Sequence, residues 1–265
     1  MTSPGIENLL IDAPTGRHFA QLHKDGQALG EAVGLFVKTG LRRGEGVVVI
    51  ASAAHTELFL GPLSQDGFDP EACRRTGQLA VINAEEALAR FMRVGMPDWA
   101  AFRQTIGGVI ESLKASGRGA IRAYGEMVDM LWHEGNTRAA VRLEEYWNDL
   151  LRLHAFSLFC AYLLDGLDEE SYAGPLHEIG RTHSNVLATE EDRRLQAALD
   201  AASQDVLGVS LSTMLSLGGR EENPGEHRIP SARRTILWLK RNMPFTASKV
   251  LARARDHYRN DPAGH

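Results

Sequence analysis

The run VVVIAS at residues 47–52 places four β-branched residues in succession. A strand with one exposed face alternates apolar and polar residues, whereas a continuous β-branched run is typical of a strand buried on both faces. The segments at 17–23, 78–83, 119–124 and 156–164 also read as strands, and segments with helical spacing separate them. This alternation predicts an α/β protein whose parallel sheet carries helices on both faces.

The pattern changes at about residue 187. Residues 188–265 show helical spacing throughout, interrupted by GGREENPGEHRIPS at 218–231, which is rich in glycine, proline and charge. Such a composition is typical of a loop or linker. We therefore expect a tail at 1–13, an α/β domain at 14–187 and an all-helical C-terminal extension at 188–265, with its linker near 218–231.

The chain lacks the motifs of the enzymes that commonly use such a sheet. A phosphate loop needs GxxxxGK[ST], but VVVIAS is followed by AAHTELF, which has neither glycine nor lysine. There is no GxSxG, and His177 and His183 are six residues apart, unlike the zinc-binding pair of HExxH. Cys160 lies in an apolar run, where a thiol is usually an inert small hydrophobe. We expect no enzymatic activity, no cofactor and no metal site.

The composition favours a cytoplasmic protein. No segment approaches the roughly 18 uninterrupted apolar residues of a membrane span. The N-terminal sequence MTSPGIENLLIDAPTG lacks the basic start and apolar stretch of a signal peptide. The two cysteines also fit a reducing compartment better than a disulfide framework. We therefore expect cytoplasmic localisation and no contact with a membrane.

The segment RAYGEM contains the first candidate site. Arg122, Tyr124 and Glu126 stand near the expected carboxyl end of a strand, which is the edge where ligands bind in open α/β sheets. Their charges fit a ligand contact and a structural ion pair equally well. On the helix expected at 137–153, Trp147 belongs to an apolar stripe and is most simply a core residue, while Glu144 flanks that stripe.

Four segments, taken in order, resemble one known family. RAYGEMVDMLWHEGN, RLEEYWNDL, FSLFCAY and HEIGRTHSNV resemble the MEDS domain, the methanogen/methylotroph DcmR-type sensory domain, and RHFAQLH with VGLFVKTGLRRGEGVVVIAS resembles its N-terminal half. The resemblance covers about residues 14–187 and implies a RecA/KaiC-like fold without a phosphate loop. It also implies a sensory module for small organic molecules such as hydrocarbon derivatives, as found in transcriptional regulators and signalling kinases. The matching polar positions are the candidate ligand-binding residues: His18, Arg122, Tyr124, Glu126, Glu144, Trp147, Asn148 and His183.

The C-terminal tail is strongly basic although the whole chain carries a net charge of -5. Between Arg228 and Arg259 there are nine Lys/Arg residues and one acid, so the remainder of the chain is strongly acidic. The tail helices either dock on the acidic body or bind nucleic acid, because clustered basic side chains can neutralise phosphates. The candidate nucleic-acid contacts are Arg233, Arg234, Lys240, Arg241, Arg253 and Arg255.

Three functional hypotheses follow. The first is a non-enzymatic sensory protein that binds a small organic ligand or a signalling protein at the carboxyl edge of the sheet around Glu126. Its C-terminal helices would relay that binding, and a homo-oligomer is compatible with this role. The second is a transcriptional regulator that binds DNA through the basic tail. The third is a residual enzyme with Glu126 as acid or base, for which no nucleophile, metal set or cofactor loop is evident.

Overall fold

A six-stranded parallel sheet forms the centre of the protein. The structure, a computed structural model, describes residues 4–23, 26–163, 175–218 and 226–260. The strand order is β3-β2-β6-β7-β1-β8, and each neighbouring pair is parallel. The strands are β1 (His18–His23), β2 (Gly46–Ala51), β3 (Leu79–Asn83), β6 (Ile121–Gly125), β7 (Ser157–Leu163) and β8 (Asn185–Leu187).

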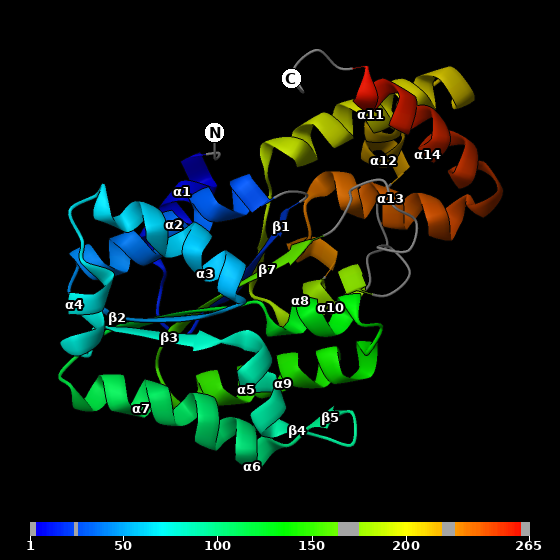
Figure 1. Cartoon of the computed structure of the whole chain (residues 1–265). Helices are drawn as coiled ribbons and strands as arrows, with labels where there is room; N and C mark the ends of the chain where they lie inside the picture. The colour runs from blue at the N-terminus through cyan, green and yellow to red at the C-terminus, as the bar shows by residue number, and fades with distance from the viewer. Residues whose placement is uncertain (1–3, 24–25, 164–174, 219–225, 261–265) are drawn as a thin grey trace.

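Helices cover both faces of this sheet (Figure 1). One face carries α1 (Pro4–Asp12), α2 (Gly26–Arg42) and α3 (Ala53–Leu60), followed by η1 (Gly61–Ser64) and α4 (Pro70–Arg75). The other face carries α5 (Ala84–Phe91), α6 (Trp99–Phe102), the π-helical turn η2 (Arg103–Gly107), α7 (Gly108–Ala115), α8 (Met127–His133), α9 (Thr137–Leu153) and α10 (Pro175–Thr182). A small hairpin, β4 (Met92–Arg93) and β5 (Met96–Pro97), follows α5. The predicted three-layer α/β architecture is confirmed.

The expected strand at 47–52 shows why this architecture arises. Every residue of β2 is buried, and successive side chains alternate between the two apolar clusters on opposite sheet faces. Val48 belongs to the cluster under α5–α9, whereas Val47 and Val49 belong to the cluster under α1–α3. Because both faces are covered, no position of the strand needs a polar side chain.

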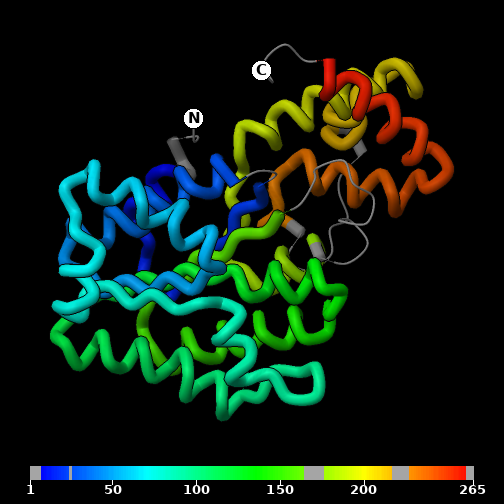
Figure 2. Tube along the Cα trace, viewed as in Figure 1, coloured from blue at the N-terminus to red at the C-terminus, as the bar shows by residue number. Residues whose placement is uncertain are grey.

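The C-terminal extension is helical, as predicted. It contains α11 (Glu190–Leu207), α12 (Leu211–Gly218), η4 (Glu226–Arg228), α13 (Ser231–Asn242) and α14 (Pro244–Arg259), and α11, α13 and α14 pack together in the tube view (Figure 2). Its apolar residues, including Leu199 and Ile236, belong to the same buried cluster as Ile179 of α10. The extension therefore shares a continuous core with the α/β domain.

The expected domain limits fall on identifiable features. The limit at residue 187 coincides with the end of β8. The expected tail at 1–13 contains helix α1, which packs against α2. The expected linker near 218–231 includes η4, but its central residues 219–225 lie outside the described part of the chain.

The basic tail helices pair with acidic residues of α11. Arg233 is buried and its Nε lies 2.9 Å from Asp192 Oδ1, while Arg253 Nε lies 2.7 Å from Asp205 Oδ2. The other tail residues predicted to contact nucleic acid, namely Arg234, Lys240, Arg241 and Arg255, also have partners. The positive charge of the tail is thus balanced in part by acidic residues of the extension itself.

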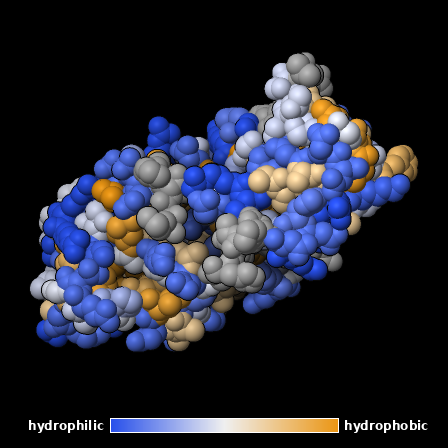
Figure 3. Space-filling model, turned by 90° about the horizontal axis from the view of Figure 1, so that it is seen from above, coloured by the Kyte–Doolittle hydropathy of each residue, from blue (hydrophilic) through white to orange (hydrophobic). Residues whose placement is uncertain are grey.

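The face seen from above is predominantly hydrophilic over both the α/β domain and the extension (Figure 3). Among the residues that the structure describes, none of the helices combines the length and the apolar character needed to span a bilayer.

Candidate functional site

The eight candidate residues do not form one site. Glu126 and Tyr124 lie at the carboxyl edge of the sheet, and Arg122 and Trp147 are structural residues. His18, Glu144, Asn148 and His183 come together near the opposite, amino edge, beneath α9 and α10.

Glu126 at the carboxyl edge is already bonded within the protein. Its Oε1 accepts a hydrogen bond from the Ser52 backbone N–H at 2.6 Å, and its Oε2 lies 2.6 Å from His55 Nδ1. The Tyr124 hydroxyl donates a longer bond, of 3.4 Å, to the same Oε2. Ser52 caps the start of α3, directly after β2, which is the position where a phosphate loop would hold an anion. The side chain of Glu126 therefore supplies a negative charge of the protein's own at that helix N-terminus.

Arg122 is not at the carboxyl edge, and that expectation was wrong. It is the second residue of β6, and its guanidinium forms an ion pair with Glu45. The same guanidinium donates hydrogen bonds of 2.7 Å to the backbone carbonyls of Leu10 and Ile11 in α1. Since Arg122 is only 1% exposed, it ties α1 to the sheet and is not available to a ligand.

Trp147 is a core residue, as the apolar stripe on its helix indicated. Its side chain is 1% exposed and packs edge-on against Phe102, with ring centroids 5.2 Å apart. A Cβ on Gly125 would lie 3.4 Å from the Trp147 ring, so the indole packs directly on the end of β6.

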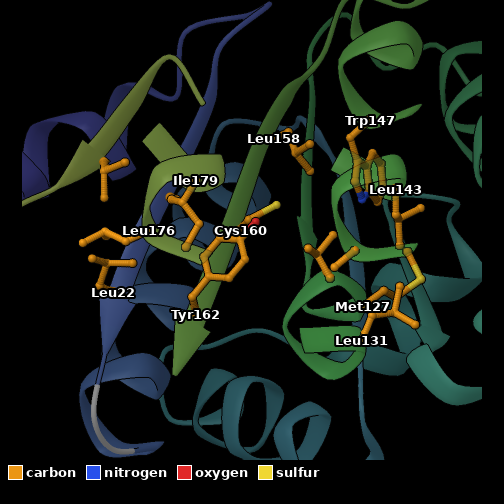
Figure 4. Close-up of a cluster of buried hydrophobic side chains, with 14 of the residues drawn as sticks. Leu22, Met127, Leu131, Leu143, Trp147, Leu158, Cys160, Tyr162, Leu176 and Ile179 are labelled. Carbon is orange, nitrogen blue, oxygen red and sulfur yellow. The ribbon is translucent and has the colours of Figure 1, made fainter. Parts of the chain in front are cut away.

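The buried cluster is assembled from four separate segments. His18 begins β1, Cys160 lies in the middle of β7, Glu144 lies on α9 and His183 follows α10. All four are buried. If each residue contributes one possible ligand atom (an imidazole nitrogen, the thiol sulfur or a carboxylate oxygen), these four atoms all lie within 4.8 Å of one another. Cys160 and Tyr162 project from the same face of β7 into the apolar core (Figure 4). We refer to His18, Glu144, Cys160 and His183 as the His/Glu/Cys cluster.

The side chains of this cluster are in direct contact. His18 Nε2 lies 3.3 Å from Cys160 Sγ and 3.4 Å from Glu144 Oε2, and His183 Nε2 lies 3.6 Å from Glu144 Oε1. The Tyr162 hydroxyl donates a hydrogen bond to Glu144 Oε1. Glu144 Oε2 is fully buried and has no hydrogen-bond partner with acceptable geometry.

Outer hydrogen bonds fix both imidazole rings. The Asn148 amide donates to the Thr182 carbonyl at 3.0 Å, so its Oδ1 faces His18 Nδ1 at 3.2 Å and accepts that proton. His183 Nδ1 lies 2.9 Å from the Ile179 carbonyl and donates to it. In both rings the Nε2 lone pair therefore points into the cluster.

Burial controls the charge of the cluster. It lowers the pKa of His18 to about 4, against the opposing effect of the Asn148 hydrogen bond. It also lowers the pKa of His183 well below its ordinary value, with a further contribution from His18. Burial raises the pKa of Glu144 and of Cys160 well above their usual ranges. Burial therefore favours the uncharged form of each of the four groups.

A polar pocket adjoins the cluster at the amino edge of the sheet. It has a volume of about 590 Å³, and Asn148 and His183 lie in its wall. Arginines outnumber acids in that wall; the charged lining residues are Arg17, Arg142, Arg152, Arg181, Arg228, Glu145 and Asp149. Arg228 belongs to the extension and donates a hydrogen bond of 2.9 Å to the His183 carbonyl. We call this cavity the amino-edge pocket.

Several residues of the two candidate sites were not predicted from the sequence. Cys160 was expected to be an inert core residue, and neither Tyr162 nor His55 was among the candidates. The signal available for the first two was their spacing, because residues two apart on a strand share a face. The contact between Cys160 and His18 could not be found this way, because it depends on how β1 pairs with β7. In that register Ala20, two residues after His18, lies opposite Cys160.

The chain has a clear family relationship. The profile described as MEthanogen/methylotroph, DcmR Sensory domain (MEDS) matches residues 17–184, which include β1, β2, β3, β6 and β7 and the whole His/Glu/Cys cluster. None of the curated proteins matches the chain. Since the matched region spans more than half of the sequence, the chain belongs to the MEDS family of sensory domains.

Proposed function

We propose that this protein is a sensor that binds a small polar organic molecule in the amino-edge pocket and relays its binding through the C-terminal helices. The observation that carries the proposal is the composition of the pocket wall. It joins α9, the segment from Arg181 to Ser184 and Arg228 of the extension. A ligand there would contact the sensory domain and the extension at once.

The pocket suits a small ligand in size and charge. A volume of about 590 Å³ lies inside the range of roughly 300–1,000 Å³ that is typical of small-molecule sites. Five arginines face two acids, and the acids take part in pairs such as Arg142–Glu145, at 2.8 Å. The excess positive charge favours an organic molecule with an anionic or strongly hydrogen-bond-accepting group.

Arg228 provides a physical link to the output. Its guanidinium contacts the His183 carbonyl, and η4, which ends at Arg228, packs on α10. A ligand that accepts hydrogen bonds from Arg228 would compete with or reinforce that contact. Relay requires that the ligand bind two arrangements of η4 with different affinity.

The carboxyl edge around Glu126, which the sequence favoured, is the weaker location for a ligand. The Glu126 carboxylate already accepts the Ser52 amide and contacts His55, so a ligand there would have to replace both bonds. An anionic ligand would also meet a like charge at the start of α3. A residual enzyme based on Glu126 would be supported by ATP turnover that Glu126→Gln abolishes.

DNA binding by the extension is the less supported output. Arg233 is 2% exposed and bonded to Asp192, so it is not presented to a phosphate backbone. Contact between the extension and a signalling protein is compatible with these ion pairs, because acidic residues of the extension already neutralise its basic helices.

Isothermal titration calorimetry of the full chain tests the proposal. The panel contains small organic acids, alcohols and halogenated hydrocarbons. We expect one-to-one binding of at least one anionic compound, weakened by at least about tenfold in Arg17→Ala. Arg75→Ala, which removes an exposed arginine of α4 outside the pocket, is the control and leaves the affinity unchanged. Heats equal to dilution across the panel overturn the proposal, as does equal weakening by both variants.

A further inference from the structure

We propose that His18, Glu144, Cys160 and His183 form a closed four-coordinate site for a divalent cation of the zinc class. This site adjoins the amino-edge pocket, whose wall includes His183, but it does not depend on a ligand there. It rests on the chemistry of the four donors, their spacing, the orientation of the two imidazoles and an unpartnered carboxylate oxygen.

The donor set matches a borderline-soft metal. Two imidazole nitrogens, a thiolate sulfur and a carboxylate oxygen are the ligand types that bind Zn²⁺ and the neighbouring transition metals, whereas Mg²⁺ and Ca²⁺ prefer oxygen alone. When a metal displaces their protons, Cys160 as a thiolate and Glu144 as a carboxylate would together carry two negative charges. A divalent cation would balance them in a fully buried position, where a net charge is costly.

The spacing is close to that of a tetrahedral site. Bonds of about 2.0–2.3 Å from a central ion place neighbouring donors about 3.3–3.6 Å apart. The measured separations from His18 Nε2 to Cys160 Sγ and Glu144 Oε2 are 3.3 and 3.4 Å. The remaining separations stay within 4.8 Å. Modest side-chain rotation therefore closes the tetrahedron.

The imidazoles are oriented as metal ligands usually are. A ligating histidine donates its second ring N–H to an acceptor outside the site, which fixes the ring and its tautomer. His18 does so toward Asn148 and His183 toward the Ile179 carbonyl. Both Nε2 lone pairs consequently converge on the same small volume.

The unpartnered Glu144 side chain indicates, independently of the donor spacing, that a ligand belongs at this position. It is 3% exposed, and its Oε2 has no hydrogen bond although it faces His18 at 3.4 Å. A buried polar atom without a partner is unfavourable, because it has lost its hydrogen bonds to water and gained none in the protein. Coordination to a cation satisfies this oxygen, and the Tyr162 hydroxyl already holds the other one in place.

Such a site would tie together the segments around the amino-edge pocket. It bridges β1, β7, α9 and the end of α10, and its ligand His183 also carries the carbonyl that accepts Arg228. The metal would thereby fix one wall of the pocket without entering it.

Metal titration of the full chain tests this inference. The purified protein is stripped with a chelator and titrated with Zn²⁺ or, as a spectroscopic probe, with Co²⁺. We expect one equivalent to bind, with a rise in Tm. Bound Co²⁺ should show the visible bands of a tetrahedral ion and a sulfur-to-cobalt charge-transfer band. No organic ligand is present, so the result is independent of the calorimetric panel.

Two variants identify the ligands, and one control excludes general thiol binding. Cys160→Ser removes the charge-transfer band, and Asn148→Ala, which releases His18, weakens binding by about 10–100-fold. Cys73→Ser alters the other cysteine, which lies outside the cluster, and keeps both band and affinity. Glu144→Gln replaces Cys160→Ser if the latter does not fold, and it is expected to weaken binding by at least about tenfold.

Three results would overturn the inference. One is a stripped wild-type chain that keeps its native circular dichroism but takes up neither metal. Another is a cobalt spectrum without the thiolate band. The last is uptake that is unchanged in Asn148→Ala and in whichever ligand variant folds. Any of these would identify the cluster as a neutral hydrogen-bonded network in the core.

Discussion

Replacing Glu126 by alanine should destabilise the protein substantially. The side chain is 6% exposed and accepts the Ser52 backbone N–H at 2.6 Å, so Glu126→Ala leaves a donor at the start of α3 without its partner. Loss of a charge-assisted hydrogen bond of this kind costs about 1.5–3 kcal/mol. The His55 contact adds little, because that ring is 38% exposed and can bond to water. We therefore expect a loss of about 2–3 kcal/mol.

Glu126→Gln separates geometry from charge. The amide oxygen still accepts the Ser52 N–H, but the negative charge at the N-terminus of α3 is lost, which costs about 0.3–1 kcal/mol. The expected order of stability is wild type, Glu126→Gln, Glu126→Ala.

Urea denaturation followed by circular dichroism measures these differences. Glu57→Ala on the same helix is the control, since Glu57 is exposed and such changes usually stay within about 0.5 kcal/mol. If Glu126→Ala lies within that margin of wild type, Glu126 does not hold α3 to β6. The carboxyl edge would then again be the leading candidate for the ligand site.

Three further predictions follow from other buried or charged groups. Asp192→Ala should cost about 3–5 kcal/mol, because it removes one partner of a buried ion pair and leaves Arg233 buried; loss of less than 1 kcal/mol in urea denaturation would contradict this. The hydrogen bond to Asp129 raises the pKa of His133 to about 9 from 6.5, so its stabilising contribution is fully present below pH 6.5 and is lost as the pH rises through about 9. Because the ring is half exposed, screening limits that contribution to about 1 kcal/mol or less. In thermal melts His133→Gln should therefore have a lower Tm than wild type below pH 6.5, and this difference should disappear as the pH rises through about 9. Gel shifts with the full chain should show no salt-sensitive DNA binding; retardation that Arg253→Glu abolishes would instead support the transcriptional role.

The sequence allowed the sheet and its layers to be predicted because local pattern determines them. The β-branched run at 47–52 became β2, and the apolar stripe at 137–153 became α9 with the same limits. Short elements escaped detection. Strand β8 has three residues and the hairpin strands have two each, which is too few for a periodicity to be recognised.

The candidate site could be predicted only in part, because tertiary register brings it together. His18 and His183 are separated by most of the domain and meet only through the order of β7, β1 and β8 in the sheet. Arg122 was placed at the wrong end of its strand, because the strand begins at Ile121 and the arginine belongs to its first half. Cys160 was judged by its apolar neighbours along the chain, whereas its polar contact is with His18 of the neighbouring strand β1.

Hydrogen–deuterium exchange of the full chain, with and without a saturating compound from the calorimetric panel, tests most directly whether ligand binding reaches the extension. We predict slower exchange at residues 181–187, which line the pocket and form β8, together with a change at residues 228–242, and loss of the second effect in Arg228→Ala. Protection confined to the turn after Ser52 and to the start of α8 would contradict the account, because it would place the ligand at the carboxyl edge and leave the extension uncoupled.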